Sequence, residues 1–317
     1  MAFLGLFGPP NVARLQAKGD VAGLVRALSY RRDPATRAAA AQCLGERAGD
    51  TTVEPLVAAL TDTMATVRQA TAGALGRIGD VRAIEPLIAA LADPEEGVRD
   101  AAASALAAVG EPAIEQLVAA LWDDAASNRE GVAKALELIG EPVLPPVVGS
   151  LCLWGKEDAF QVAMRVLSHV DRTSATLMLV DGLAVGGSGY AVAEALGYLG
   201  DPLAVEPLIR ALQYEAVGSA AACALARIGD ERAVEPLIAM IEPERLSFDS
   251  LAAIDALGSM GDPRAVQPLI ALLDQEPIVT WPVAGALAKI GEPAVVPLIG
   301  TIRERSPAMV LPAATSL

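Results

Sequence analysis

A four-residue phrase recurs along this chain about every thirty residues and constrains the fold more than any other feature. It reads Val-Glu-Pro-Leu at residues 53–56, 205–208 and 234–237, with close variants at 84–87, 114–117 and 266–269. About twenty residues after each phrase comes Ala-Leu, followed by Gly-Asp or Gly-Glu. Repetition with this period indicates a stacked array, because one unit of this length cannot bury its own apolar face.

Residues 81–111 show how one unit is built. Apolar residues recur at the i, i+3, i+4, i+7 spacing from Ile84 to Leu91, which predicts a first helix that Asp80 can cap. Asp93-Pro94 then interrupts the helical pattern. A second helix is expected from near Glu95 to Gly110, a residue free to adopt positive φ. The unit is therefore a pair of antiparallel helices, and about ten such units predict an all-α solenoid.

The repeat also sets the expected domain organisation. Residues 1–10 are apolar and lack the basic and small-residue features of a secretory signal, so we expect them to cover the first repeat. Residues 11–317 are expected to form a single repeat solenoid whose last repeat is incomplete. No run of about eighteen apolar residues is present to span a bilayer, so no membrane insertion is predicted.

Composition narrows the classes of partner. The formal net charge is −15, and an acidic surface repels phosphate backbones and anionic lipid, which argues against nucleic-acid binding. Cys43, Cys152 and Cys223 lie far apart, with neither disulfide nor zinc spacing. They are expected to be small buried thiols in a reducing, cytoplasmic compartment.

The recurring phrase, the spacing Asp-x5-Arg and the sequence Ala-Leu-x2-Ile-Gly-Asp together resemble the HEAT-repeat family. The resemblance is to the short bacterial and archaeal type named after phycobilisome lyases, and it covers nearly the whole chain. It implies a right-handed superhelix in which second helices line the concave face and first helices form the convex face. The motif is specific for the fold and says little about function.

In this family, charged residues near the start of each second helix form a ladder that links neighbouring repeats. Three aspartate and arginine pairs here have the matching six-residue spacing: Asp62 and Arg68, Asp93 and Arg99, Asp123 and Arg129. We interpret them as such a structural ladder; the alternative is a stripe of arginines that binds phosphate or carboxylate groups.

The position after each arginine is expected to face the groove, because it lies opposite the buried stripe of its helix. It is polar or acidic in the first half of the chain and largely apolar in the second half. Exposed apolar residues grouped on a concave face predict a partner-binding surface, although rotation of the helices or an absent cap would bury them instead. The predicted groove comprises Tyr190, Leu251, Trp281 and Leu311, with Phe160 and Phe248 near its margin.

Catalytic and metal sites have little support in the sequence. His169 is the single histidine, whereas the HEAT-like deoxyhypusine hydroxylases hold two irons with paired His-Glu motifs. Zinc sites and catalytic triads fail for the same lack of ligands and bases. The aspartates that follow the terminal glycines recur at one structural place, which indicates helix caps. No metal, cofactor or catalytic residue is predicted.

These observations favour a non-catalytic scaffold or adaptor that binds a protein partner in a prokaryotic cytosol. The alternative, which rests on the resemblance alone, is a bilin-chromophore lyase or another phycobilisome-handling subunit. A partner helix or an extended hydrophobic segment is expected along the groove. The last repeat ends at Leu317, so we also expect an end-to-end contact, such as one with a second copy of the chain, at the C-terminal repeat.

Overall fold

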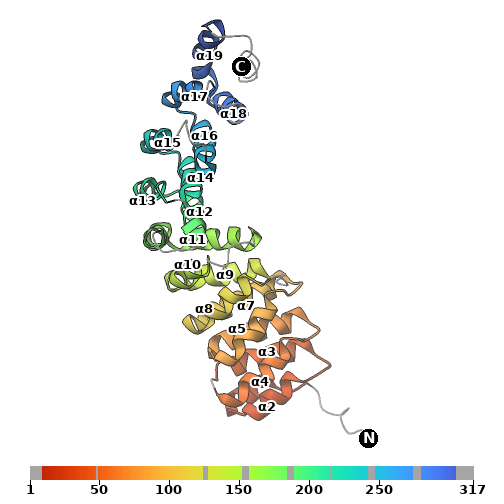
Figure 1. Cartoon of the computed structure of the whole chain (residues 1–317). Helices are drawn as coiled ribbons and strands as arrows, with labels where there is room; N and C mark the ends of the chain where they lie inside the picture. The colour runs from red at the N-terminus through yellow and green to blue at the C-terminus, as the bar shows by residue number, and fades with distance from the viewer. Residues whose placement is uncertain are drawn as a thin grey trace. The chain divides into compact units, whose positions relative to one another are not determined.

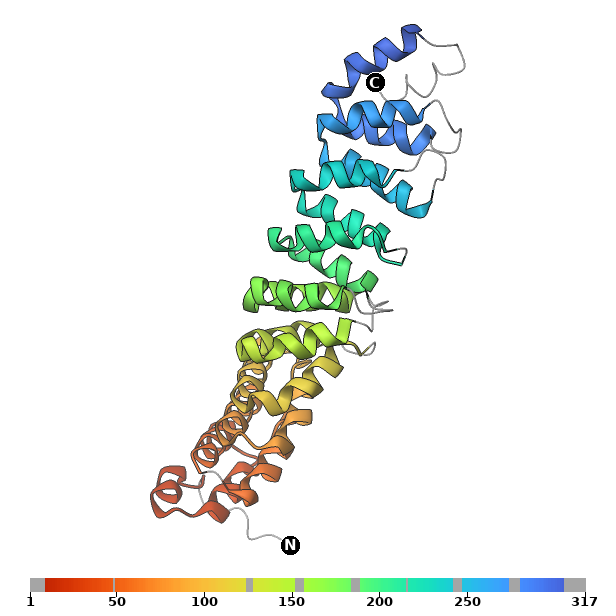
Figure 2. The same ribbon diagram turned by 60° about the vertical axis from the view of Figure 1, so that its left-hand side comes forward.

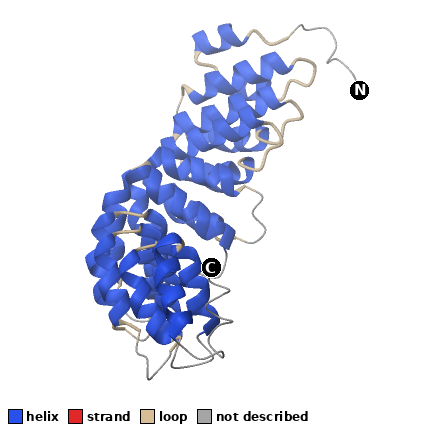
Figure 3. Cartoon of the chain, turned by 90° about the horizontal axis from the view of Figure 1, so that it is seen from above, coloured by secondary structure: helices blue, strands red, loops and turns tan. Residues whose placement is uncertain are grey.

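The regular elements of the protein are helices throughout the part of the chain described by the computed structural model (Figure 3). That part comprises residues 9–47, 49–123, 128–151, 157–183, 189–214, 216–241, 247–273 and 280–304. The chain divides into two compact units, Met1–Val170 and Asp171–Leu317.

In the first unit, first and second helices alternate along the chain and lie in two layers (Figures 1 and 2). The first helices are α2 (Val21–Leu28), α4 (Asp50–Ala59), α6 (Ile84–Ala90), α8 (Ile114–Leu121) and α10 (Leu144–Ser150). The second helices are α3 (Pro34–Gly45), α5 (Ala65–Ile78), α7 (Glu96–Val109), α9 (Arg129–Ile139) and α11 (Glu157–Gly182) as far as residue 170. The 3₁₀ turns η1 (Val81–Ala83), η2 (Glu111–Ala113) and η3 (Glu141–Val143) precede α6, α8 and α10, and the short helix α1 (Val12–Lys18) contacts α2 and α3.

The second unit has the same alternation. It begins at Asp171, where the helical backbone of α11 is interrupted (φ −161°, ψ 100°) and the aspartate side chain accepts a bond from the amide of Ser174. Its first helices are the remainder of α11, α13 (Val205–Ala211), α15 (Val234–Ala239), α17 (Val266–Leu272) and α19 (Glu292–Glu304). Its second helices are α12 (Gly189–Leu199), α14 (Gly218–Ile228), α16 (Phe248–Met260) and α18 (Thr280–Ile290). The 3₁₀ turns η6 (Pro202–Ala204), η7 (Glu231–Ala233) and η8 (Pro263–Ala265) precede α13, α15 and α17.

The described residues thus contain nine helix pairs and α19, which confirms the prediction of an all-α solenoid of about ten pairs. The residues that follow α19, including Leu311, lie outside the described part of the chain, as does the predicted cap segment except for Pro9 and Pro10.

Local signals of the sequence fix the ends of the helices. The side chains of Asp80, Asp230 and Asp262 each accept a hydrogen bond, of 2.9, 3.0 and 2.9 Å, from the backbone amide two residues later. These bonds confirm the predicted caps and satisfy amides that the helix itself cannot pair. Gly79 ends α5 with a φ of 69°, a conformation in which a side chain would clash.

The two periodic leucines of each repeat form the core. Leu87 of the recurring phrase and Leu106 of the Ala-Leu pair are fully buried, and so are their counterparts in the neighbouring repeats. Small residues let successive second helices approach closely; Gly76 of α5 packs directly against the backbone of Ala105 in α7. Because both features recur with the repeat, each helix pair completes the core of the next within its unit.

Candidate functional site

Three of the predicted groove residues are exposed in the second unit, and they lie where second helices begin. Tyr190 is the second residue of α12 and is 41 % exposed, and Trp281 is the second residue of α18 and is 69 % exposed. Phe248, the first residue of α16, is 88 % exposed, and Leu251 of the same helix is partly exposed. We call these four residues the binding strip. They present apolar surface to solvent, whereas the leucines of the recurring phrase and of the Ala-Leu pairs in the same unit are buried.

The prediction for Phe160 is wrong, because this side chain is only 1 % exposed. Phe160 occupies the repeat position that Arg68 occupies in α5, and the corresponding residues Gly189, Gly218 and Ser250 are also buried. An arginine at this position reaches polar groups at the helix ends, whereas an apolar ring packs inward. Phe160 therefore belongs to the core of the first unit.

Sequence reasoning missed two exposed aromatic residues, Tyr198 near the end of α12 and Tyr214. Tyr214 lies just after α13 and four residues before α14 begins, and it is 46 % exposed. Comparison of a single repeat position could not detect it, because Tyr214 precedes the matching residue, Ser219, by five positions. A search for any aromatic residue between the two helices of each pair would have found it.

Charged side chains beside the strip pair across neighbouring second helices. Arg227 of α14 lies 3.7 Å from the carboxylate of Glu194 in α12, and its guanidinium stacks 4.2 Å from the ring centre of Tyr198. Lys289 of α18 pairs at 2.5 Å with Asp255 of α16. These contacts link α12 to α14 and α16 to α18, and as partly exposed ion pairs each contributes little to stability.

One cysteine of the second unit is exposed, which corrects the expectation that the thiols are buried. Cys223 of α14 is exposed, whereas Cys43 is buried and Cys152 lies outside the described residues. Partial desolvation by the surrounding protein nevertheless raises the pKa of the Cys223 thiol. Partial burial, followed by the charge of Glu194, likewise raises the pKa of Tyr190. Neither group is activated as a nucleophile or a base at neutral pH.

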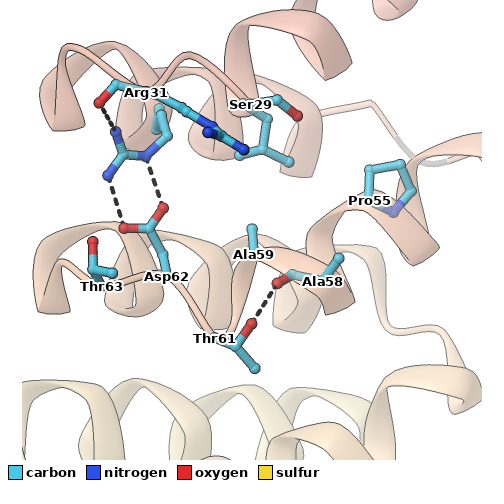
Figure 4. Close-up of a pocket in the computed structure, with 10 residues that line it drawn as sticks. Ser29, Arg31, Pro55, Ala58, Ala59, Thr61, Asp62 and Thr63 are labelled. Atoms are coloured by element: carbon cyan, nitrogen blue, oxygen red, sulfur yellow. Dashed lines mark hydrogen bonds and ion pairs between the residues drawn. The ribbon is translucent and has the colours of Figure 1, made fainter.

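Arg68 of the proposed ladder donates hydrogen bonds both to the next repeat and to its own repeat. Arg68 forms two hydrogen bonds with Asp93 of the next repeat, at 2.6 and 2.7 Å, and a third of 2.9 Å with the carbonyl oxygen of Asp62. Arg37 pairs with Asp62 in the same way, and both ion pairs are mostly buried. Figure 4 shows Asp62 with the two bonds that it accepts from Arg37, beside Arg31 and Thr63 in a pocket of about 600 Å³.

The last two ladder arginines bind backbone carbonyl groups. Arg99 donates to the carbonyl oxygens of Asp93 and Pro94 at 2.7 and 2.9 Å, and Arg129 donates to that of Asp123 at 2.7 Å. The six-residue spacing seen in the sequence thus corresponds to a guanidinium that satisfies the end of the first helix of its own repeat. The ion pair with a carboxylate runs from one repeat to the next.

Replacement of Arg68 by alanine is expected to lower the free energy of unfolding by about 0.5–2 kcal/mol, because it leaves the mostly buried Asp93 carboxylate without its partner. Urea denaturation followed by circular dichroism measures the change. Arg77→Ala in the same helix is the control, since Arg77 is exposed and makes a single 3.3 Å bond with a carbonyl oxygen. Equal effects of the two substitutions would contradict a structural role for the ladder.

Stability is also expected to fall in acid as these carboxylates protonate. Hydrogen bonds from Arg37 and Arg68 lower the pKa values of Asp62 and Asp93, and those from Arg82 lower the pKa of Asp80 to about 2. A carboxyl group whose folded pKa lies below its unfolded value, about 3.9, stabilises the fold above that value. The stabilisation is lost as the pH falls through the folded pKa. Melting temperatures between about pH 5 and pH 2 should therefore drop, and less steeply in Asp62→Asn and Asp93→Asn variants.

The matching face of the first unit is charged. A pocket of about 510 Å³ lies over α7, α9 and the first part of α11, and His169 is among its lining residues. Lys134 pairs with Asp100 at 2.6 Å, and Arg165 pairs with Glu130 at 3.0 Å. These charges satisfy one another across repeats, and the described residues contain no group of three potential metal ligands.

Among the described helices, none is alone long and apolar enough to cross a membrane. One bent pair, Glu96–Val109 with Glu111–Leu121, meets the length and composition requirements across a bend of 115°.

Comparison with known proteins agrees with this architecture. The family model of HEAT repeats matches residues 21–107, 84–168, 190–246 and 250–316. Curated protein sequences give no significant match.

Two solved structures align with this chain over nearly their whole length. The complex of CpcE and CpcF of phycocyanin lyase from Nostoc sp. PCC7120 is 21 % identical, with a TM-score of 0.33 over 76 % of this chain and 94 % of that chain.

The other is human deoxyhypusine hydroxylase in complex with glycerol, 20 % identical with a TM-score of 0.33 over 89 % of this chain and 99 % of that chain. A Kap121p mutant is 13 % identical, with a TM-score of 0.51 over 99 % of this chain and 42 % of that chain, so this chain spans less than half of Kap121p. The repeat matches cover most of the sequence, and the helix pairs they predict are present in both units. The chain belongs to the HEAT-repeat family.

Proposed function

We propose that this chain is a non-catalytic scaffold or adaptor that binds a protein partner through the binding strip. The observation that carries the proposal is the uneven distribution of exposed apolar side chains. Of thirteen large apolar residues that are exposed in the described part of the chain, ten lie in the second unit. Three of these ten, Tyr190, Phe248 and Trp281, belong to the binding strip. Exposed apolar residues grouped on one surface mark interaction sites, and aromatic residues dominate the binding energy of such sites.

The charge pattern supports a binding role rather than catalysis. The carboxylates that recur at the repeat ends are helix caps, and those on the second helices pair with arginine or lysine. We place the protein in a prokaryotic cytosol, a compartment that keeps Cys43 and Cys223 as free thiols. An end-to-end contact through α19 is a further part of the proposal, supported by Val296, which is strongly exposed.

The experiment is affinity capture of partners from the source cells by the wild-type chain and by a Tyr190→Ala/Trp281→Ala variant. Loss of two aromatic anchors is expected to weaken binding of a captured partner at least about tenfold, as measured by calorimetry. Leu203→Ala is the matched control, because Leu203 lies in η6 at the opposite edge of the helices and is also half-exposed. Circular dichroism should show all three proteins equally helical.

Two results would contradict the proposal. One is normal partner binding by the double variant. The other is capture of a bilin with its characteristic visible absorbance, in place of a stoichiometric protein partner. That second result would favour the alternative function, a bilin-chromophore lyase or another phycobilisome-handling subunit.

A further inference from the structure

The second unit carries one exposed aromatic residue in each of four consecutive repeats. Tyr190, Tyr214, Phe248 and Trp281 lie at or just before the starts of α12, α14, α16 and α18. First and second helices of a pair run in opposite directions, so the starts of all second helices lie at one edge of the unit. We call these four residues the aromatic edge. Five aromatic side chains are exposed among the described residues, and four of them belong to this edge; the fifth is Tyr198.

The spacing between the residues of the aromatic edge favours one conformation of a bound partner segment. Packed helices lie about 8–10 Å apart, so successive second helices present their aromatic residues at about that interval. A polyproline-II segment has three residues per turn and a rise of about 3.1 Å per residue, so it repeats about every 9.3 Å. Every third residue of such a segment meets one aromatic side chain. Ten to twelve residues, roughly, would cross all four repeats.

A helical partner fits this edge less well. An amphipathic helix buries a continuous apolar stripe, and its seven-residue repeat is about 10.5 Å long. The exposed or partly exposed neighbours of the aromatic residues include the polar Ser219, Ser247 and Asp249, and Leu251 lies one turn beyond Phe248 in α16. Isolated aromatic residues separated by polar positions are the surface against which proline rings pack in grooves for proline-rich segments.

The net charge of the second unit determines which charged residues a bound proline-rich segment would carry. Residues 171–317 contain nine lysines and arginines against eighteen aspartates and glutamates, a net charge of −9. Asp249 directly follows Phe248 and is partly exposed, and the Asp255 carboxylate, six residues further along α16 and paired with Lys289, is 69 % exposed. Basic side chains on a bound segment would be attracted to this surface, and acidic ones would be repelled.

We propose that the aromatic edge binds a proline-rich segment of a partner protein, in polyproline-II conformation and with interspersed basic residues. This rests on the proposed protein-binding function and adds the chemistry of the ligand. Tyr214 is the residue that separates the two proposals. It belongs to the aromatic edge and supplies the contact in the repeat formed by α13 and α14, but it is not part of the binding strip.

The test uses three fluorescein-labelled peptides and fluorescence anisotropy with the full chain. The first contains four Pro-Pro-Arg triplets, the second contains four Gly-Gly-Arg triplets with the same charge, and the third is a helical peptide with leucine at every seventh position and the same number of arginines. The first peptide is expected to bind at least about tenfold more tightly than the second, because its backbone is already ordered. Added salt should weaken its binding.

Tyr214→Ala is expected to weaken binding of the Pro-Pro-Arg peptide about fivefold or more, and Leu203→Ala should leave it unchanged. Equal binding of the proline and glycine peptides would show attraction by charge alone and would overturn the inference. So would tighter binding of the helical peptide, absence of binding by all three, or a Tyr214→Ala variant that binds normally while remaining folded. None of these results removes the proposed function, which fails only if the natural partner binds the Tyr190→Ala/Trp281→Ala variant normally or if a bilin is captured in its place.

Discussion

Phe160→Ala is expected to lower the free energy of unfolding of the first unit by about 3–5 kcal/mol. The ring is 1 % exposed, and its removal leaves a cavity that the surrounding helices can fill only in part. Urea denaturation monitored by circular dichroism measures the loss. The variant also separates the core from the binding strip, because Phe160 contributes no exposed surface to a partner.

Phe248→Ala is the matched control for this substitution. Phe248 is 88 % exposed at the start of α16, so its removal should change the unfolding free energy by less than about 0.5 kcal/mol. Binding should respond in the opposite way, with a loss in Phe248→Ala and none in a folded Phe160→Ala variant. A small stability effect at Phe160 would mean that this ring is not part of the core.

Gly76→Ala is expected to destabilise the fold by about 1–3 kcal/mol, although alanine is the better helix former. A Cβ atom at Gly76 would lie 2.6 Å from the Cα atom of Ala105 in α7, so the two second helices would have to move apart. The same contact joins Gly45 to Ala74 and Gly258 to Ala286. The expected loss therefore reports on the packing of successive repeats.

Gly73→Ala in the same helix provides a control of opposite sign. A Cβ atom there would meet only the end of the Arg77 side chain, at 3.8 Å. The substitution should stabilise α5 by about 0.5–1 kcal/mol, since it removes backbone freedom from the unfolded chain. Melting temperatures of the two variants should therefore move in opposite directions. A stabilising Gly76→Ala change would contradict the close approach of α5 and α7.

Features that depend on neighbouring residues could be read from the sequence. The apolar spacing from Ile84 to Leu91 forms a helix because side chains three and four residues apart share one face. Asp80 caps a 3₁₀ turn through an amide only two residues away, and Gly79 ends a helix through its own φ angle. These are short-range effects, and their repetition every thirty residues or so is what predicts the solenoid.

The sites were harder to predict, because they depend on how far a side chain reaches in space. The spacing in the sequence associates Arg68 with Asp62, but the carboxylate partner of Arg68 is Asp93, and the bond to Asp62 uses the backbone. Tyr214 stands outside the repeat register, so no alignment of repeats relates it to Trp281, yet both are exposed where a second helix starts.

The helix pairs, their caps and their buried leucines follow from the order of residues alone, because each depends on contacts within one repeat or on a pattern that every repeat shares. The direction of Phe160 and the close contact between Gly76 and Ala105 do not. Each depends on which atoms an adjacent repeat places at that point, and that is set only when the helices pack. The aromatic edge belongs to this second group, since its four members become neighbours on one surface only through the stacking of four repeats.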